Sequence, residues 1–112
     1  TSMFIDPDPS QLEASAQIES PWVELHTGSF ARAWLEPECR KKELATLRQG
    51  MEIGVSLGLR VNAGHGINYE NVEGAKTLDL VYEYNIGHSI VCRALSTGFA
   101  EAVQTMRRML NE

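Results

Sequence analysis

The chain has 112 residues, of which 10 are Lys or Arg and 15 are Asp or Glu, so its net charge at pH 7 is −5. This acidic balance argues against a nucleic-acid binder, and 43% apolar against 22% charged residues is the composition of one folded domain and not of a disordered chain. The sequence has no apolar run that would span a bilayer and no leader pattern, so we expect a cytoplasmic protein without a membrane partner.

Four times along the chain, a short apolar run ends at a turn and an amphipathic stretch follows, a repeat typical of βα units. The first unit is predicted as a strand over residues 2 to 6 and a helix over about residues 9 to 19. At the start of this helix Asp8 suits the N-cap, Pro9 suits the first helical position, and Gln11 completes a capping box.

The second predicted strand, residues 22 to 26, alternates in chemistry, because successive side chains of a strand point to opposite faces. Polar and aromatic residues fall on one face and aliphatic residues on the other: Trp22, Glu24 and His26 against Val23 and Leu25. Such a difference indicates that one face of this strand points toward a site.

A long helix is predicted over residues 37 to 57, with Gly58 as its stop. Its apolar face is predicted to hold Leu44, Leu47, Met51, Gly54 and Val55. The third strand, residues 59 to 62, leads into a glycine-rich loop, after which Asn68 is placed to cap a short helix.

The fourth predicted strand, residues 82 to 86, is followed by two helical pieces, residues 89 to 95 and residues 99 to 110, separated by a break at Thr97-Gly98. The last piece carries an apolar stripe that we expect in the core: Phe99, Ala102, Val103, Met106, Met109 and Leu110.

Four βα units in succession predict an α/β protein with a parallel sheet covered by helices. Alone they leave two open sheet edges and an uncovered inner face, which folded proteins cover or pair. The sequence also begins with Thr1-Ser2-Met3, almost inside the first predicted strand. We therefore expect residues 1 to 112 to be half of a single domain that needs a partner half.

Each of the three histidines follows the end of a predicted strand: His26, His65 and His88. The carboxyl edge of a parallel sheet is where α/β proteins bind ligands and place catalytic groups. The shared position of the three histidines therefore predicts a functional site at this edge.

The last two of these loops, Gly64-His65-Gly66 and Gly87-His88, contain glycines that let backbone N–H groups approach a ligand. The second loop opens onto a short extra helix, whose free N–H groups and dipole favour an anion. TIM barrels commonly bind a phosphate in this layout. The pattern thus favours a phosphate site, while the same glycines also suit the simple ending of a strand.

Four segments carry a family resemblance, in order and in spacing: Phe4-Ile5-Asp6, Glu24 to Gly28, Val61 to Tyr69, and Asn85 to Ile90 followed by Arg93-Ala94. Together they resemble the C-terminal half of the pyridoxine 5'-phosphate synthase family. The resemblance implies a TIM (β/α)8 barrel, of which this chain supplies the last four βα units, strands five to eight.

The resemblance further implies ring closure between 3-amino-2-oxopropyl phosphate and 1-deoxy-D-xylulose 5-phosphate, giving pyridoxine 5'-phosphate, inorganic phosphate and water. No metal or organic cofactor is expected. By its motif His65 corresponds to the family's proton donor. Gly66, Gly87 and His88 correspond to residues that bind the aminooxopropyl phosphate substrate.

Glu24 and His26 lie in the motif of the sixth strand, and we expect them to line the site or to support it. The family's other catalytic groups, a His and a Glu that act as bases, come from strands one to four, which this chain lacks. The resemblance therefore implies the N-terminal half of the same barrel as a partner and an inactive fragment without it. It also implies a homo-oligomer, an octamer in the family.

Two alternatives belong to other classes of protein. The three histidines could instead hold a catalytic Zn²⁺, with Glu24 as the base of a hydrolase. The chain could also be a non-enzymatic half-barrel that dimerises to cover its edges. Cys39 and Cys92 stand far apart and outside any metal-like spacing, so we expect free thiols.

Overall fold

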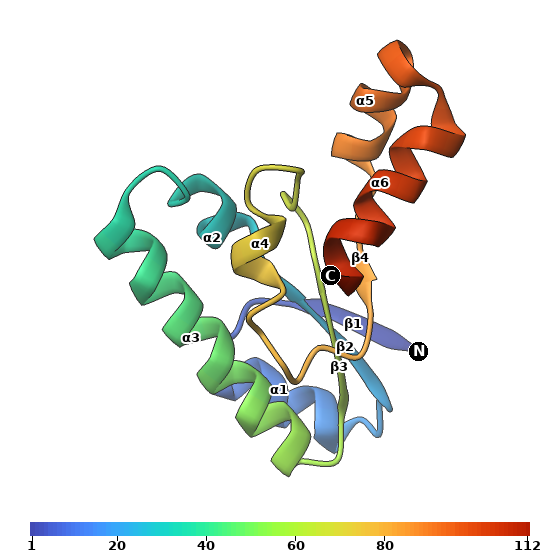
Figure 1. Cartoon of the computed structure of the whole chain (residues 1–112). Coiled ribbons are helices and arrows are strands. Elements are labelled where there is room, and N and C mark those ends of the chain that lie inside the picture. The colour runs from blue at the N-terminus through green and yellow to red at the C-terminus, as the bar shows by residue number, and fades with distance from the viewer.

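The computed structural model describes residues 1–112 as a four-stranded sheet with six helices (Figure 1). In chain order the elements are β1 (Ser2–Ile5), α1 (Pro9–Gln17), β2 (Trp22–His26), α2 (Gly28–Arg32), α3 (Pro37–Ser56), β3 (Arg60–Gly64), α4 (Val72–Ala75), β4 (Tyr84–Asn85), α5 (His88–Thr97) and α6 (Phe99–Asn111). No helix is long and apolar enough to cross a membrane.

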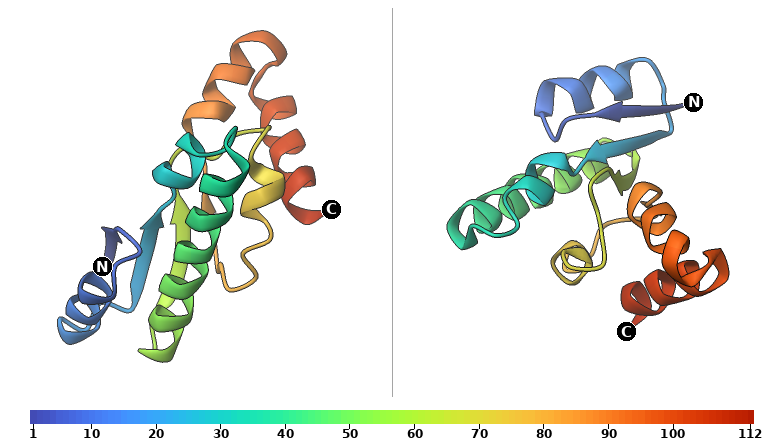
Figure 2. Two further views of the ribbon diagram at one scale, coloured as in Figure 1. Left: turned by 90° about the vertical axis from the view of Figure 1, so that its left-hand side faces the viewer. Right: turned by 90° about the horizontal axis from the view of Figure 1, so that it is seen from above.

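The strands lie in the order β1-β2-β3-β4, and every neighbouring pair is parallel. Each strand therefore joins its neighbour through a crossover, which is the βα arrangement expected from the sequence. Seen from above, α1, α3 and α4 lie on one side of the sheet (Figure 2). The predicted α/β class and parallel strand order are confirmed.

The aliphatic face of the sheet packs against the helices and forms the core. Val23 and Leu25 of β2 and Val61 and Ala63 of β3 are all at most 1% exposed. They belong to one cluster with side chains from the helices, among them Leu12, Leu47, Met51 and Met106. The alternation predicted for residues 22 to 26 is confirmed, because aliphatic burial on this face leaves Trp22, Glu24 and His26 on the opposite one.

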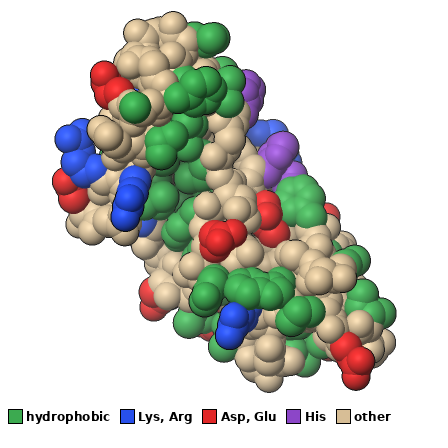
Figure 3. Space-filling model, turned by 90° about the vertical axis from the view of Figure 1, so that its right-hand side faces the viewer, with side chains coloured by type: hydrophobic (Ala, Val, Ile, Leu, Met, Phe, Trp, Pro, Cys, Tyr) green, Lys and Arg blue, Asp and Glu red, His purple; other side chains and the backbone are tan.

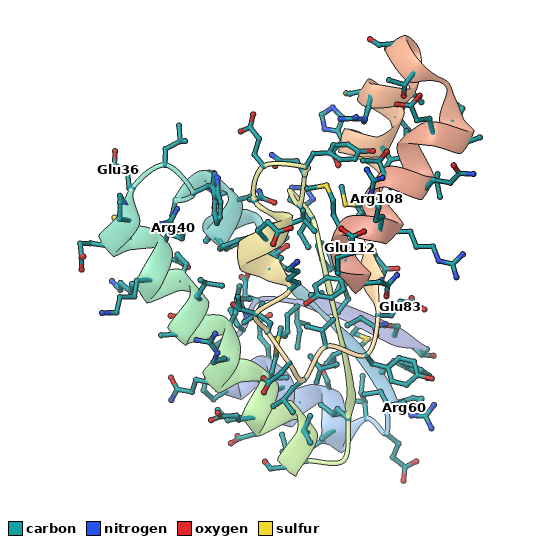
Figure 4. All side chains as sticks on the ribbon, viewed as in Figure 1. Glu36, Arg40, Arg60, Glu83, Arg108 and Glu112 are labelled. Atoms are coloured by element: carbon teal, nitrogen blue, oxygen red, sulfur yellow. The ribbon has the colours of Figure 1, made fainter.

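We call this opposite face of the sheet the inner face. It is partly uncovered, since Phe4 of β1 is 56% exposed. At its amino-terminal end the Arg60 guanidinium lies over the rings of Trp22, at 4.9 Å, and Tyr82, at 5.4 Å. Figure 4 labels Arg60 at the end of the sheet opposite to α5. These cation–π contacts fill the amino-terminal end of the inner face and leave its carboxyl end open.

The fourth strand was predicted over residues 82 to 86, but β4 contains only Tyr84 and Asn85. The preceding residues keep single hydrogen bonds to β3, from Tyr82 N–H to the Val61 carbonyl and from Ala63 N–H to the Glu83 carbonyl. Because β4 is at the edge of the sheet, no second neighbour holds the rest of the segment in a regular strand.

Two predicted helix faces are partly wrong. On α3, Leu47, Met51 and Gly54 are buried as predicted, but Val55 is 46% exposed and Gly50 takes its place in the interior, against Pro7. On α6, Ala102 and Met106 are buried, whereas Phe99 and Val103 are 62% and 48% exposed. The α6 stripe is wider than the surface that this chain offers to cover it. The short helix α2 was not predicted.

The start of α1 follows the predicted cap with one difference. Asp8 Oδ1 accepts hydrogen bonds from the N–H and the hydroxyl of Ser10, at 2.8 and 2.6 Å, and Pro9 opens the helix. Gln11 does not close a capping box, because its Oε1 accepts from Asp6 N–H instead, at 3.1 Å. At the end of α3, Gly58 adopts a φ of 81° and stops the helix as predicted.

This cap predicts an acid dependence of stability. The hydrogen bonds from Ser10 hold the pKa of Asp8 below its usual 3.8. Since the pKa is lowered in the folded state, the cap stabilises the fold above the unfolded pKa, and this contribution is lost as the pH falls through the folded pKa. In urea unfolding between pH 5 and pH 2, Asp8→Asn should lose less stability than the wild type. Equal pH dependence in the two proteins would contradict the role of the charged cap.

Candidate functional site

A cavity of about 460 Å³ lies at the carboxyl ends of β3 and β4. Its lining comes from the inner face of the sheet, from the two loops that follow these strands and from the start of α5: Phe4, Glu24, His65, Gly66, Ile67, Asn68, Asn85, Ile86, Gly87, His88, Ser89 and Cys92. Figure 3 shows the histidine side chains gathered along one side of the molecule. The predicted site residues except His26 therefore share one cavity.

His26 lies behind His65 and does not line the cavity. The two imidazole rings are stacked, with centroids 4.5 Å apart and planes at 23°. Gly28 N–H donates to Nδ1 of His26 at 3.3 Å, and a Cβ at Gly28 would collide with the His26 ring. The ring of Phe4 packs against the His26 ring, with the two ring centroids 5.2 Å apart. His26 is thus a fixed surface on which the His65 ring rests.

His65 has an unusual backbone, because its φ is 79° and the φ of the following Gly66 is 81°. A left-handed conformation is strained for a residue with a side chain and costs roughly 1–3 kcal/mol, and it occurs most often where a site needs it. A Cβ at Gly66 would also come within 2.7 Å of the Ala31 Cβ. Glycine at position 66 is therefore required both by its conformation and by its close contact with α2.

The Glu24 carboxylate lies on the inner face, beside the carboxyl ends of β3 and β4. Its Oε2 accepts a hydrogen bond from Asn85 Nδ2 at 2.7 Å. Gly64 makes room for this carboxylate, since a Cβ there would collide with it. The register places Asn62 beside Glu24, and the buried Oδ1 of Asn62 has no hydrogen-bond partner within this chain.

The loop after β4 presents backbone donors to the cavity. The first N–H groups of α5 have no intrahelical acceptors, and neither Gly87 nor Gly66 donates a backbone hydrogen bond. Ser89 Oγ donates to the Ile67 carbonyl at 2.8 Å, which fastens this loop to the loop after β3. The two loops together form a concave surface rich in N–H donors, which suits an anion.

Several polar residues that position these loops were not singled out from the sequence. Thr27 and Asn71 are buried, and their side chains donate to the carbonyls of His65 and Gly66, respectively. The cap predicted for Asn68 exists in a modified form, because its Oδ1 accepts from Glu70 and Asn71 N–H in the turn that precedes α4. Thr27 belongs to the segment Glu24 to Gly28 that carries the family resemblance, but no role was predicted for it.

The side chains do not form the cluster that a three-histidine metal site needs. No group of three or more His, Cys, Asp or Glu residues is arranged to hold a metal ion. Cys39 and Cys92 are free and exposed, in agreement with the sequence. The zinc-hydrolase alternative gains no support from this geometry.

Comparison with known proteins gives matches along the chain. The family model described as "Pyridoxal phosphate biosynthesis protein PdxJ" matches residues 1–112. The pyridoxine 5'-phosphate synthase of Opitutus terrae is 52% identical over 110 residues, which are 98% of this chain and 44% of that protein. That of Trichodesmium erythraeum is 52% identical over 110 residues, or 98% of this chain and 45% of the relative.

A third relative, the pyridoxine 5'-phosphate synthase of Solidesulfovibrio magneticus, is 53% identical over 106 residues, 95% of this chain and 44% of that protein. The chain therefore spans less than half the length of these relatives. Since the family match extends from the first residue to the last, the chain belongs to the family of pyridoxal phosphate biosynthesis protein PdxJ.

Proposed function

We propose that the whole protein is a cytoplasmic pyridoxine 5'-phosphate synthase, and that this chain contributes its phosphate site and its proton donor. In this reaction 3-amino-2-oxopropyl phosphate and 1-deoxy-D-xylulose 5-phosphate give pyridoxine 5'-phosphate, inorganic phosphate and water. The observation that carries the proposal is the cavity in which His65 lies beside Gly66, Gly87 and His88. The names of the relatives support it.

The phosphate group of the aminooxopropyl substrate fits between Gly66 and the turn Gly87-His88. The unpaired N–H groups of both loops and the positive end of α5 favour a dianion there, even though the whole chain is acidic. This position leaves the reacting part of the substrate near the His65 imidazole, which lines the same cavity. An imidazole exchanges protons near neutral pH and can protonate a leaving hydroxyl or phosphate.

Residues 1–112 would form the C-terminal half of one TIM-barrel domain, that is, its last four βα units. Two observations favour a partner half. Both β1 and β4 are edge strands of the sheet. An apolar groove of about 340 Å³ follows the β4 edge, lined by Tyr84, Ile86, Val103, Met106 and Leu110 among others. The N-terminal half of the same barrel would pair with these edges and add the remaining catalytic bases. We further propose that whole barrels assemble as a homo-oligomer.

The activity is tested with the whole protein incubated with both substrates. Product formation is followed by mass spectrometry of pyridoxine 5'-phosphate and by release of inorganic phosphate. Formation of both products at equal rates supports the proposed function. Consumption of one substrate without the other would overturn it.

Replacing Gly87 by Val should raise KM for 3-amino-2-oxopropyl phosphate. No atom lies within 4 Å of a Cβ at Gly87, so the new side chain would fit the fold and occupy the open space in which we place the phosphate. Gly87 has a φ of −123°, so the substitution does not force a side chain into the left-handed region. We expect at least about a tenfold rise in KM, the effect of losing roughly 1.4 kcal/mol of binding.

Gly98→Val is unsuitable as a control for this variant because Gly98 has a φ of 82°, so Ser96→Val on the same helix α5 serves instead. This control should leave KM within about twofold of the wild type, as expected for a surface change remote from the cavity. A wild-type KM in Gly87→Val would show that the phosphate binds in another part of the protein.

A further inference from the structure

We infer that Thr27 is a positioning residue for the proposed reaction: its hydroxyl holds the peptide between His65 and Gly66 in the orientation that the site requires. The inference rests on the proposed function, because its kinetic test measures the proposed reaction. Its structural test measures only the backbone and stacking of His65. Thr27 is fully buried directly after β2, and it lies behind the loop that carries His65.

The Thr27 hydroxyl lies within hydrogen-bond distance of two carbonyl oxygens, at 2.7 Å from Gly64 O and at 2.6 Å from His65 O. A hydroxyl has one proton to donate. Gly64 O already accepts the backbone N–H of Thr27 at 2.8 Å, whereas His65 O accepts no other hydrogen bond. The carbonyl that depends on the Thr27 hydroxyl is therefore the carbonyl of His65.

The peptide that contains this carbonyl joins two left-handed residues, since φ is 79° at His65 and 81° at Gly66. Rotation about the N–Cα bond of His65 would relieve this strain. It would move the His65 carbonyl away from Thr27 and the imidazole away from the ring of His26. The hydrogen bond from Thr27 opposes this rotation. It thus stabilises the one backbone conformation that stacks His65 on His26 within the cavity.

The same peptide also directs the N–H of Gly66. A trans peptide is planar, so its C=O and N–H groups point in opposite directions, and the chain has no cis peptide. While the His65 carbonyl points at Thr27, the Gly66 N–H points the other way, and Gly66 lines the cavity. The buried hydroxyl of Thr27 therefore fixes the orientation of both the proposed proton donor, His65, and one proposed phosphate contact, the Gly66 N–H.

Two further side chains hold the carbonyls that follow. Asn71 Nδ2 donates to Gly66 O at 3.0 Å, and Ser89 Oγ donates to Ile67 O at 2.8 Å. Every carbonyl from position 64 to position 67 is thus held by a buried or partly buried donor. Among these donors Thr27 alone acts on His65 itself.

The test compares Thr27→Val, which keeps the branched shape and removes the hydroxyl, with Thr27→Ser, which keeps the hydroxyl. In the whole protein, Thr27→Val should lower kcat at least about tenfold and raise KM for 3-amino-2-oxopropyl phosphate, as expected for the loss of one buried hydrogen bond at the site. Thr27→Ser should restore both constants to within about threefold of the wild type.

The matched control is Ser20→Ala. Ser20 is a buried hydroxyl just before β2, and it also contacts two carbonyls, Thr1 O at 3.1 Å and Trp22 O at 2.9 Å. It lies at the opposite end of the strand from the cavity, so its loss should lower stability and leave kcat and KM unchanged. A kcat defect of equal size in Ser20→Ala would show that Thr27 acts only through general stability.

A double variant tests whether Thr27 acts through His65. If it does, adding Thr27→Val to His65→Asn lowers kcat no further, because the positioned group is already absent. Multiplication of the two kcat defects would overturn the inference, and so would a wild-type kcat in Thr27→Val alone. If His65→Asn lowers kcat and Thr27→Val does not, this inference fails while the proposed function stands.

A crystal structure of Thr27→Val gives a readout that is independent of activity. We expect φ of His65 to leave the left-handed region and the stacking on His26 to be lost, and both features should be present in Thr27→Ser. An unchanged backbone at His65 in Thr27→Val would overturn the inference even in a protein with no synthase activity.

Discussion

Replacing His65 by Asn in the whole protein is expected to lower kcat at least about a hundredfold, because a general acid is typically worth about 10² to 10⁴ in rate. KM for both substrates should change little, since the lost group transfers a proton and does not bind the phosphate. Asn suits this experiment because it tolerates a left-handed backbone better than most residues, and φ of His65 is 79°. Steady-state kinetics at saturating concentrations of both substrates measures the effect.

His65→Gly provides a complementary test. Glycine adopts the same positive φ without strain, and it leaves the imidazole space empty beside His26. Added free imidazole should then restore part of the lost turnover, while the same addition should not change the wild type. A wild-type kcat in His65→Asn, or a defect confined to KM, would remove the general-acid role.

Leu25→Ala should have the largest effect on stability. Leu25 is 0% exposed in β2, where it pairs with Ile5 of β1 and Ala63 of β3. Its truncation leaves a cavity between the sheet and α3, and such changes lower the free energy of unfolding by about 2–5 kcal/mol. Urea unfolding of the whole protein measures the difference.

Leu35→Ala is the matched control, since the same substitution falls on a side chain that is 83% exposed before α3. It should change the free energy of unfolding by less than about 0.5 kcal/mol, as is usual for surface positions. Equal losses in the two variants would contradict the packing of the sheet against its helices.

The fold could be predicted where the signal is local. The alternation of Trp22 to His26 is a period of two, and the cap at Asp8 is a hydrogen bond between near neighbours. The predictions are wrong where the burial of a residue depends on a surface that is distant in the sequence. Val103 continues the apolar period of α6, but its burial depends on what lies beyond the β4 edge, and this chain puts nothing there.

The site was predicted in the same uneven way. The edge that holds His65 and His88 follows from their place after predicted strands. The stacking of His26 on His65 and the contact of Thr27 with His65 O join residues 38 or more positions apart, and they depend on the register of β2 and β3. A sequence without a known register predicts that these residues share an edge, but not which of them touch.

The most direct test of the central claim is a crystal structure of the whole protein with 3-amino-2-oxopropyl phosphate. We expect the phosphate group to lie between Gly66 and the turn Gly87-His88, within hydrogen-bond distance of their N–H groups, and the His65 imidazole to lie beside the rest of the substrate. A phosphate bound elsewhere, with this cavity free of substrate, would contradict it.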